Sequence, residues 1–120
     1  METKFNFNSQ VCTTREQSER LLALGLKKET ADMLIMSYST NQDIIALPWS
    51  KSGGWTKDNS LPAWSLHRLI EMIDDECVIR LSDFTITGRV FMVNDNLFNN
   101  IIDCIEWLIN EGYFNKEYLV

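Results

Sequence analysis

Histidine and cysteine are scarce in this chain of 120 residues. There is one histidine, His67, and there are three widely spaced cysteines, Cys12, Cys77 and Cys104. No Cys-x-x-Cys pair occurs, and a single histidine cannot complete the ligand set of a zinc finger. We therefore expect the protein to bind no metal and no cofactor.

The same scarcity makes a catalytic site difficult to assemble. A thiol nucleophile would need His67 as its base, and helical winding places His67 on the flank of its helix, away from the apolar arc. The acidic run 74–76 has no further ligands at a useful spacing, and Gly53-Gly54 lacks the lysine and serine of a phosphate loop. The sequence predicts a protein that is not an enzyme, without a catalytic residue.

Long apolar runs are also absent. No stretch reaches the roughly 20 uncharged apolar residues that a membrane span needs. The first eight residues lack the apolar centre of a secretion signal. An odd number of cysteines then indicates reduced thiols, so we expect a cytoplasmic protein without a membrane partner.

Basic residues are few in the C-terminal part of the chain. The net charge is -6, and residues 71–120 hold ten acidic residues against three basic ones. Such a segment repels phosphate backbones, which disfavours nucleic acid as a partner. Solubility is the simplest interpretation of this charge.

The composition is otherwise that of an ordinary globular domain, with 45% hydrophobic residues. We expect one domain over 1–120, in which residues 1–11 form either a terminal strand or a loosely docked arm. Periodicity predicts helices over 15–24, 61–73 and 95–110 and a helical turn over 27–33 that can continue to 36. Strands are predicted over 44–47, 77–82, 84–87 and 89–93.

These elements predict an α+β fold. The short spacings within 77–93 favour an antiparallel meander, because parallel strands need a longer crossover. We expect a small antiparallel sheet of about three strands, with three to four helices packed mainly on one face.

Capping residues define the helix ends. A capping box begins the first helix, formed either by Thr13 with Glu16 or by Thr14 with Gln17. Asn94 is expected to cap the last helix.

The last helix and the residues after it are strongly apolar. Cys77 and Cys104 lie on the apolar faces of their elements, so both thiols are expected to be buried and unreactive. The segment 113–120 is apolar enough to dock on the rest of the chain.

Four tryptophans form the candidate interaction surface: Trp49, Trp55, Trp64 and Trp107. Tryptophan is common in protein cores, but it is also the residue type most enriched at binding hot spots. Trp49 and Trp55 flank a glycine-rich loop, where a packed core is harder to supply.

The two helical tryptophans are placed by angle. Trp107 falls outside the apolar stripe of its helix, so we expect it to contact the chain termini or a partner subunit. Trp64 points away from the apolar arc of its own helix. If Ser65 is the N-cap instead, Trp64 precedes the helix and can pack on Leu69.

Three segments together resemble a known group of proteins: Cys12–Met33, Leu61–Ile73 and Asp103–Leu119. They resemble small uncharacterised proteins of gut bacteria of the Bacteroides group, which are associated with prophage and other mobile elements. The run Leu61-Pro-Ala-Trp-Ser is the most distinctive part. The resemblance implies a bacterial cytoplasmic setting and supplies no catalytic residue.

The leading hypothesis is a non-enzymatic binding or accessory module of a bacterial mobile element or cytoplasm. Its aromatic surface would take a protein partner or a second copy of the chain. The alternative is a DNA-associated regulatory protein with a helix-turn-helix-like segment 13–36, whose phosphate contacts would be Arg15, Arg20, Lys27 and Lys28. Its second helix offers almost no base-reading groups. A small enzyme comes third.

Overall fold

The structure, a computed structural model, describes residues 10–37, 43–48 and 60–120. Over these residues the chain forms three α-helices: α1 (Arg15–Ala23), α3 (Leu66–Met72) and α4 (Leu97–Glu111). It forms five strands: β1 (Met33–Ser37), β2 (Asp43–Pro48), β3 (Ser60–Ala63), β4 (Cys77–Arg80) and β5 (Thr85–Gly88). Two single-turn 3-10 helices complete the order, η1 (Lys28–Thr30) and η2 (Lys116–Tyr118).

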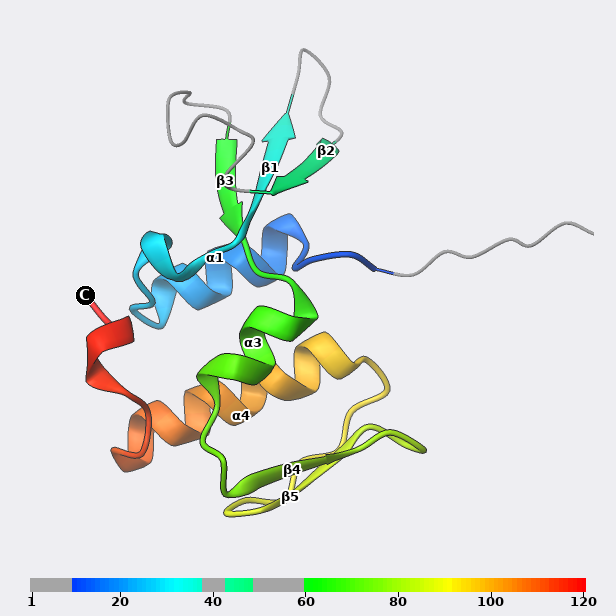
Figure 1. Cartoon of the computed structure of the whole chain (residues 1–120), viewed down its shortest axis with the longest axis vertical. Helices are drawn as coiled ribbons and strands as arrows, with labels where there is room; N and C mark the ends of the chain where they lie inside the picture. The colour runs from blue at the N-terminus through cyan, green and yellow to red at the C-terminus, as the bar shows by residue number, and fades with distance from the viewer. Residues whose placement is uncertain (1–9, 38–42, 49–59) are drawn as a thin grey trace, which may run out of the picture.

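The strands form two separate antiparallel sheets. One has the order β2-β1-β3, and the other is the hairpin of β4 and β5. The three α-helices lie between these two sheets (Figure 1). The predicted α+β class is confirmed, but the strands are divided over two sheets instead of one, so the helices do not cover a single face.

The segment 33–36, which was expected to continue a helical turn, is strand β1. Only η1 is helical in this region. β1 is the central strand of its sheet, and Leu34 and Ile35 on its two faces are both buried. A short apolar run that is buried on both faces has the same pattern as a buried helix, so periodicity could not separate the two. The strand predicted over 44–47 is confirmed as β2.

Helix α3 begins later than the predicted helix over 61–73, because residues 61–63 belong to β3. Leu61 precedes Pro62, and the residue before a proline is disfavoured in helical conformation. Pro62 lies in an edge strand, where its missing N–H is tolerated. Ser65 caps α3, and its hydroxyl accepts a hydrogen bond from the Arg68 N–H at 3.1 Å.

The predicted third strand over 89–93 does not form. Only Met92 pairs with β5, through an isolated bridge. Arg89 turns back to Asp74, with 2.6 Å between its Nε and the carboxylate. Asn100 of α4 donates a hydrogen bond to the Met92 carbonyl at 3.1 Å. The segment is thus tied to α4 and to the turn before β4, and it does not extend along β5.

The helix ends agree in part with the predicted caps. The capping box at Thr14 is confirmed: its hydroxyl accepts from the Gln17 N–H, and the Gln17 side chain accepts from the Thr14 N–H. The N-cap of α4 is Asn96 and not Asn94, because the Asn96 side chain accepts from the Asn99 N–H at 3.0 Å.

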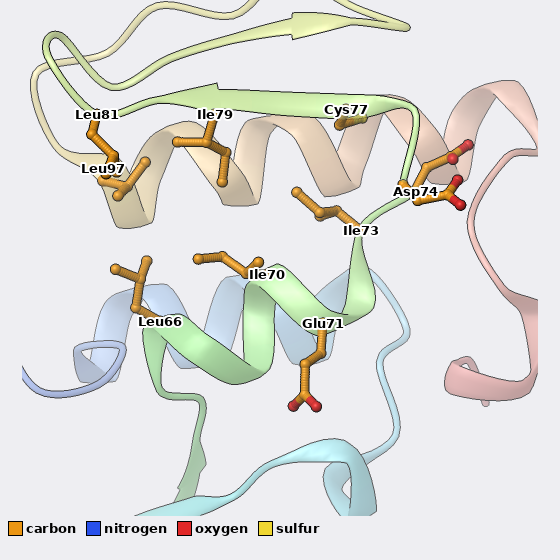
Figure 2. A pocket seen from close by; sticks show the side chains of 10 residues that line it. Leu66, Ile70, Glu71, Ile73, Asp74, Cys77, Ile79, Leu81 and Leu97 are labelled. Atoms are coloured by element: carbon orange, nitrogen blue, oxygen red, sulfur yellow. The ribbon is translucent and has the colours of Figure 1, made fainter.

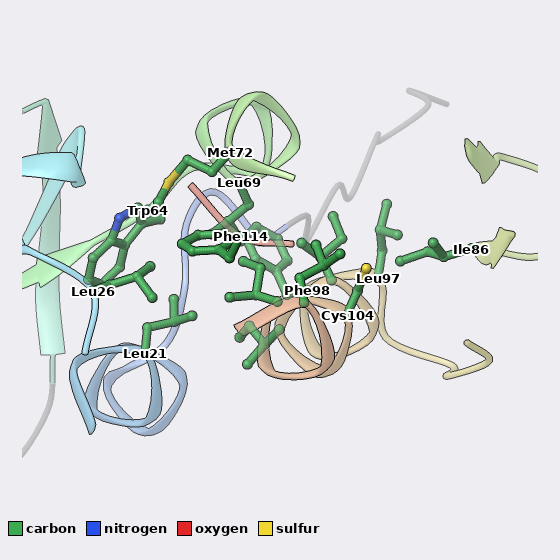
Figure 3. Packing of buried hydrophobic residues seen from close by; sticks show 14 of the residues in the cluster. Leu21, Leu26, Trp64, Leu69, Met72, Ile86, Leu97, Phe98, Cys104 and Phe114 are labelled. Carbon is green, nitrogen blue, oxygen red and sulfur yellow. The ribbon is translucent and has the colours of Figure 1, made fainter. Parts of the chain in front are cut away.

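Trp64 occupies the centre of the hydrophobic core. It is fully buried in the same cluster as Leu69, which agrees with the expectation for a helix capped by Ser65. Its Nε1–H donates a hydrogen bond to the Thr30 hydroxyl at 2.9 Å. Figure 3 shows Trp64 among side chains from α1, the loop after α1, α3 and the C-terminal segment: Leu21, Leu26, Leu69, Met72 and Phe114.

The C-terminal segment docks as predicted. Leu119 forms an isolated bridge with Leu26, and the Val120 N–H donates to the Gly25 carbonyl at 2.8 Å. Phe114 is buried in the main core. The segment therefore closes over the loop that follows α1.

Candidate interaction groove

The four tryptophans do not form one surface. Trp49 and Trp55 lie outside the described residues. Trp64, expected on the interaction surface, is fully buried. Ser65 is the N-cap of α3, so Trp64 precedes the helix and packs in the core. Only Trp107 reaches the surface described here, and it is half-buried.

Trp107 is covered by the C-terminal segment. Its ring stacks on that of Tyr113, with 5.9 Å between the centroids. The Arg89 guanidinium lies 4.2 Å from the Tyr113 ring centroid and also contacts Asp74. The expectation that Trp107 contacts a chain terminus is confirmed.

A different feature offers a binding surface, a groove between α3 and β4 with a volume of about 420 Å³. Figure 2 shows that α3 forms one wall, β4 and the residue after it form the other, and the start of α4 closes one end. The lining is mostly apolar: Leu66, Ile70, Ile73, Cys77, Ile79, Leu81 and Leu97.

Each wall follows from a simple sequence pattern. Leu66, Ile70 and Ile73 recur at helical spacing and share one face of α3. Cys77 and Ile79 alternate along β4 and share one face of the strand. Both patterns were recognised in the sequence, but both were assigned to the core. The signal that was missed is the shortness of the facing elements, which leaves this space unfilled.

Two apolar residues of the groove are exposed to solvent. Ile70, on its helical wall, is 42% exposed, and Leu81, at its mouth, is 78% exposed. Four other exposed large hydrophobic residues come from the same hairpin region: Val78, Phe84, Phe91 and Val93. This exposed apolar surface is divided over the two faces of β4, because Val78 alternates with the groove residues Cys77 and Ile79.

One end of the groove is acidic. Glu71, Asp74 and Asp75 belong to the lining of the groove, but Figure 2 shows the Glu71 carboxylate pointing away from it, and Arg89 pairs with Asp74 at 2.6 Å. The N–H of Glu76 and the guanidinium of Arg89 hold the pKa of Asp74 below its usual range, so this carboxylate is ionised at neutral pH. An apolar ligand segment that carries a positive charge would be complementary to this end.

One backbone edge of β4 carries no paired strand in the described residues. The Cys77 N–H donates to the Asp74 carbonyl at 2.9 Å and so points away from β5. Ile86, which is paired with Ile79, exchanges both of its backbone hydrogen bonds with Met92 on the far side of β5. Because N–H and C=O directions alternate along a strand, the N–H and C=O of Ile79 also point away from β5.

Figure 2 shows β4 lying between β5 and α3. Within the described residues, no other strand pairs with β4. An edge of unpaired N–H and C=O groups beside an apolar groove is the arrangement to which an extended peptide can add as a further strand.

The surroundings of the two residues considered for catalysis, Cys12 and His67, differ in burial. Burial, with the nearby Asp32 carboxylate, raises the pKa of the Cys12 thiol to about 11, which makes it a poor nucleophile. His67 is exposed on α3, beside Glu71. The described residues contain no group of three or more histidine, cysteine or acidic side chains that could hold a metal ion. In the same residues, no helix is long and apolar enough to cross a membrane.

The helix-turn-helix-like segment lacks its second helix, since residues 33–37 form β1. Arg20, one of its four expected phosphate contacts, instead holds Asp103 and Glu106 of α4, each at 2.7 Å.

Comparison of the chain with protein-family models, with curated proteins and with solved structures gives no match. Its function therefore has to be inferred from the geometry of the groove.

Proposed function

We propose that the protein is a non-enzymatic binding module that holds an extended segment of a partner protein in the groove between α3 and β4. The segment adds to the outer edge of β4 and places alternate apolar side chains in the groove. The observation that supports the proposal is that β4, whose side chains line an apolar groove with an acidic end, has an edge that no other described strand pairs with.

Hydrogen bonding gives the segment its register. In strand addition, main-chain hydrogen bonds supply affinity, and pockets for every second side chain supply specificity. Ile79 offers one N–H and one C=O at the centre of the edge. Ile70 of α3 and Ile73, the residue after α3, line the groove opposite Cys77 and Ile79, so every second side chain of an added strand would reach an apolar surface.

Charge sets the preferred sequence of the segment. Asp74 and Asp75 lie together at one end of the groove, and residues 71–120 carry seven more acidic than basic residues. A segment with lysine or arginine next to its apolar residues is favoured there, and an acidic segment is repelled. The bacterial mobile-element setting implied by the sequence resemblance remains a prediction about where such a partner occurs.

The test uses nine-residue peptides of alternating valine and threonine. Two of the peptides carry a pair of lysines, one peptide at its N-terminus and the other at its C-terminus. Two matched peptides carry a pair of glutamates at the same positions. Binding is measured by isothermal titration calorimetry. We expect a lysine peptide to bind and the glutamate peptides to bind at least tenfold more weakly. Equal binding of both pairs, or binding by neither, would contradict the proposal.

Two variants locate the binding site. Ile70→Lys places a charge on the helical wall and should weaken binding at least tenfold. Val78→Lys is the matched control, because Val78 is also exposed and alternates with the groove residues Cys77 and Ile79. It should bind as the wild type does. If both variants bind equally well, the peptide lies elsewhere.

A second copy of the chain is the competing occupant. Sedimentation velocity over a range of concentrations distinguishes it from a partner segment. If the wild type is a dimer and Ile70→Lys is a monomer, the occupant of the groove is a second copy of the chain and not a partner segment. A monomer at all concentrations is the expected result.

A further inference from the structure

Cys77 and Cys104 meet at the base of the groove, although 27 residues separate them in the chain. Their Sγ atoms are 3.9 Å apart, and both thiols are free. We propose that these two residues are a disulfide-forming pair, closed by exchange with a low-molecular-weight disulfide. The proposal does not depend on what occupies the groove.

The required movement is small and falls on one side of the pair. The sulfur atoms of a disulfide are about 2.0 Å apart, so the two thiols must approach by about 2 Å. Cys104 lies in the middle of α4 and is completely buried. Cys77 is the first residue of β4 and follows the exposed residues Asp75 and Glu76. The turn before β4 can therefore supply the displacement without disturbing the helix.

The two thiols differ in accessibility, which fixes the order of reaction. Cys77 was expected to be buried, but it lines the groove and is only half-buried, so a small reagent can reach its sulfur. Cys104 is enclosed and can be reached only by Cys77. Cys12 belongs to a different buried cluster, with Ile35 and Ala63, and takes no part.

The exchange balances in two steps. The Cys77 thiolate attacks one sulfur of the external disulfide, forms a mixed disulfide and releases one thiolate. The Cys104 thiol then loses its proton, its sulfur attacks Cys77 Sγ, and the second external thiolate leaves. The two protons from the protein end on the two released thiols. The external disulfide is reduced by two electrons, and the cysteine pair is oxidised by two.

The surroundings favour a stable cross-link that forms slowly. Burial raises the pKa of Cys77 and raises that of Cys104 to about 12, so few thiolates are present at neutral pH. A thiol of high pKa is also a poor leaving group, which slows reopening of the disulfide. These properties suit a lasting modification better than a catalytic thiol relay.

The test treats the intact wild-type protein with glutathione disulfide. Free thiols are then alkylated after unfolding, and the protein is digested without reduction for mass spectrometry. We expect a peptide joined through Cys77 and Cys104, two hydrogens lighter than its parts, and an alkylated Cys12. The initial rate should rise about tenfold from pH 7 to pH 8, as the thiolate fraction does.

Two variants check the order of the steps. Cys12→Ser should form the same joined peptide. Cys104→Ser should keep glutathione on Cys77, because nothing resolves the mixed disulfide. The wild-type digest decides the question even if Cys104→Ser is unstable. Glutathione retained on Cys77 of the wild type, cross-links that include Cys12, or three alkylated cysteines would each overturn the proposal.

Discussion

Trp107 is an aromatic residue on the polar side of an amphipathic helix, and a single neighbour accounts for it. Its ring lies nearly parallel to that of Tyr113, at an interplanar angle of 18°. Offset aromatic pairs contribute about 1 kcal/mol beyond the area they bury. The same tyrosine ring also carries the Arg89 guanidinium. Trp107 is thus held by contacts within the chain, and its place on α4 requires no partner subunit.

A double-mutant cycle measures this pair. Trp107→Ala, Tyr113→Ala and the double variant should show a coupling energy of about 1 kcal/mol in urea denaturation. Trp107→Glu should also lower the melting temperature, with no change in elution volume, because the Tyr113 ring is within the same chain. Additive single effects would show that the stacked pair contributes nothing. An altered elution volume would point to a contact between subunits.

The β4–β5 hairpin depends on the absence of a side chain at one position. Gly88 has a φ of +97°, and a Cβ atom there would lie 2.0 Å from the Glu76 carbonyl oxygen. The backbone turn before β4 therefore packs directly on the end of β5. Since this turn also carries Asp74 and leads into Cys77, the acidic end of the groove depends on the same close approach.

Gly88→Ala should destabilise the protein more than an equivalent change at another left-handed glycine. Gly112 is the matched control, because its φ is +80° and no heavy atom lies within 4 Å of its added Cβ. Gly112→Ala should cost about 1 kcal/mol from conformation alone. Gly88→Ala should cost about 2 kcal/mol or more, because the backbone must also move. Urea denaturation compares them, and equal losses would contradict the close approach.

The elements differ in how far their sequences determine them. The fifteen-residue α4 has a long apolar stripe and a left-handed glycine at its end, so its C-terminal end was predicted to within one residue, whereas its start and its N-cap were predicted two residues too early. The run 33–36 has only four residues, which is too short for its hydrophobic periodicity to distinguish a strand from a helix. The apolar spacing of α3 extends N-terminally to Pro62, so the spacing alone does not show where the helix begins. Tertiary contacts select Ser65 as the N-cap. One is the bond from its N–H to Asp32 at 2.8 Å.

The groove was less predictable than the elements that form it. Helical spacing alone predicts that Leu66 and Ile70 share one helical face, and strand alternation predicts that Cys77 and Ile79 share one strand face, as observed. Whether two apolar faces touch or leave a space depends on their distance, which no local pattern encodes. The buried Asn100 illustrates the same limit, since its Nδ2 donates to the carbonyls of Phe84 and Met92 across the fold.

At the scale of the whole molecule, the helices are tied together by polar contacts at one surface and by the core beneath it. Arg20 of α1 spans Asp103 and Glu106 of α4, but these side chains are each more than a third exposed. Exposed ion pairs of this kind contribute little to stability. The core contribution is therefore the larger one, and it includes residues from α1, α3, α4, β5 and the C-terminal segment.

Phe114 tests whether the C-terminal segment is an integral part of that core. Its ring is 5% exposed and lies 5.7 Å, centroid to centroid, from Tyr118 in an edge-on contact. Phe114→Ala should reduce the free energy of unfolding by about 3–5 kcal/mol, a large share of the total for a small domain. Phe91→Ala is the matched control, because Phe91 is 69% exposed, and it should change the value by less than about 0.5 kcal/mol. Chemical denaturation of both variants makes the comparison. A small loss for Phe114→Ala would mean that the segment rests on the surface of the domain, and that the core formed by α1, α3 and α4 is complete without it.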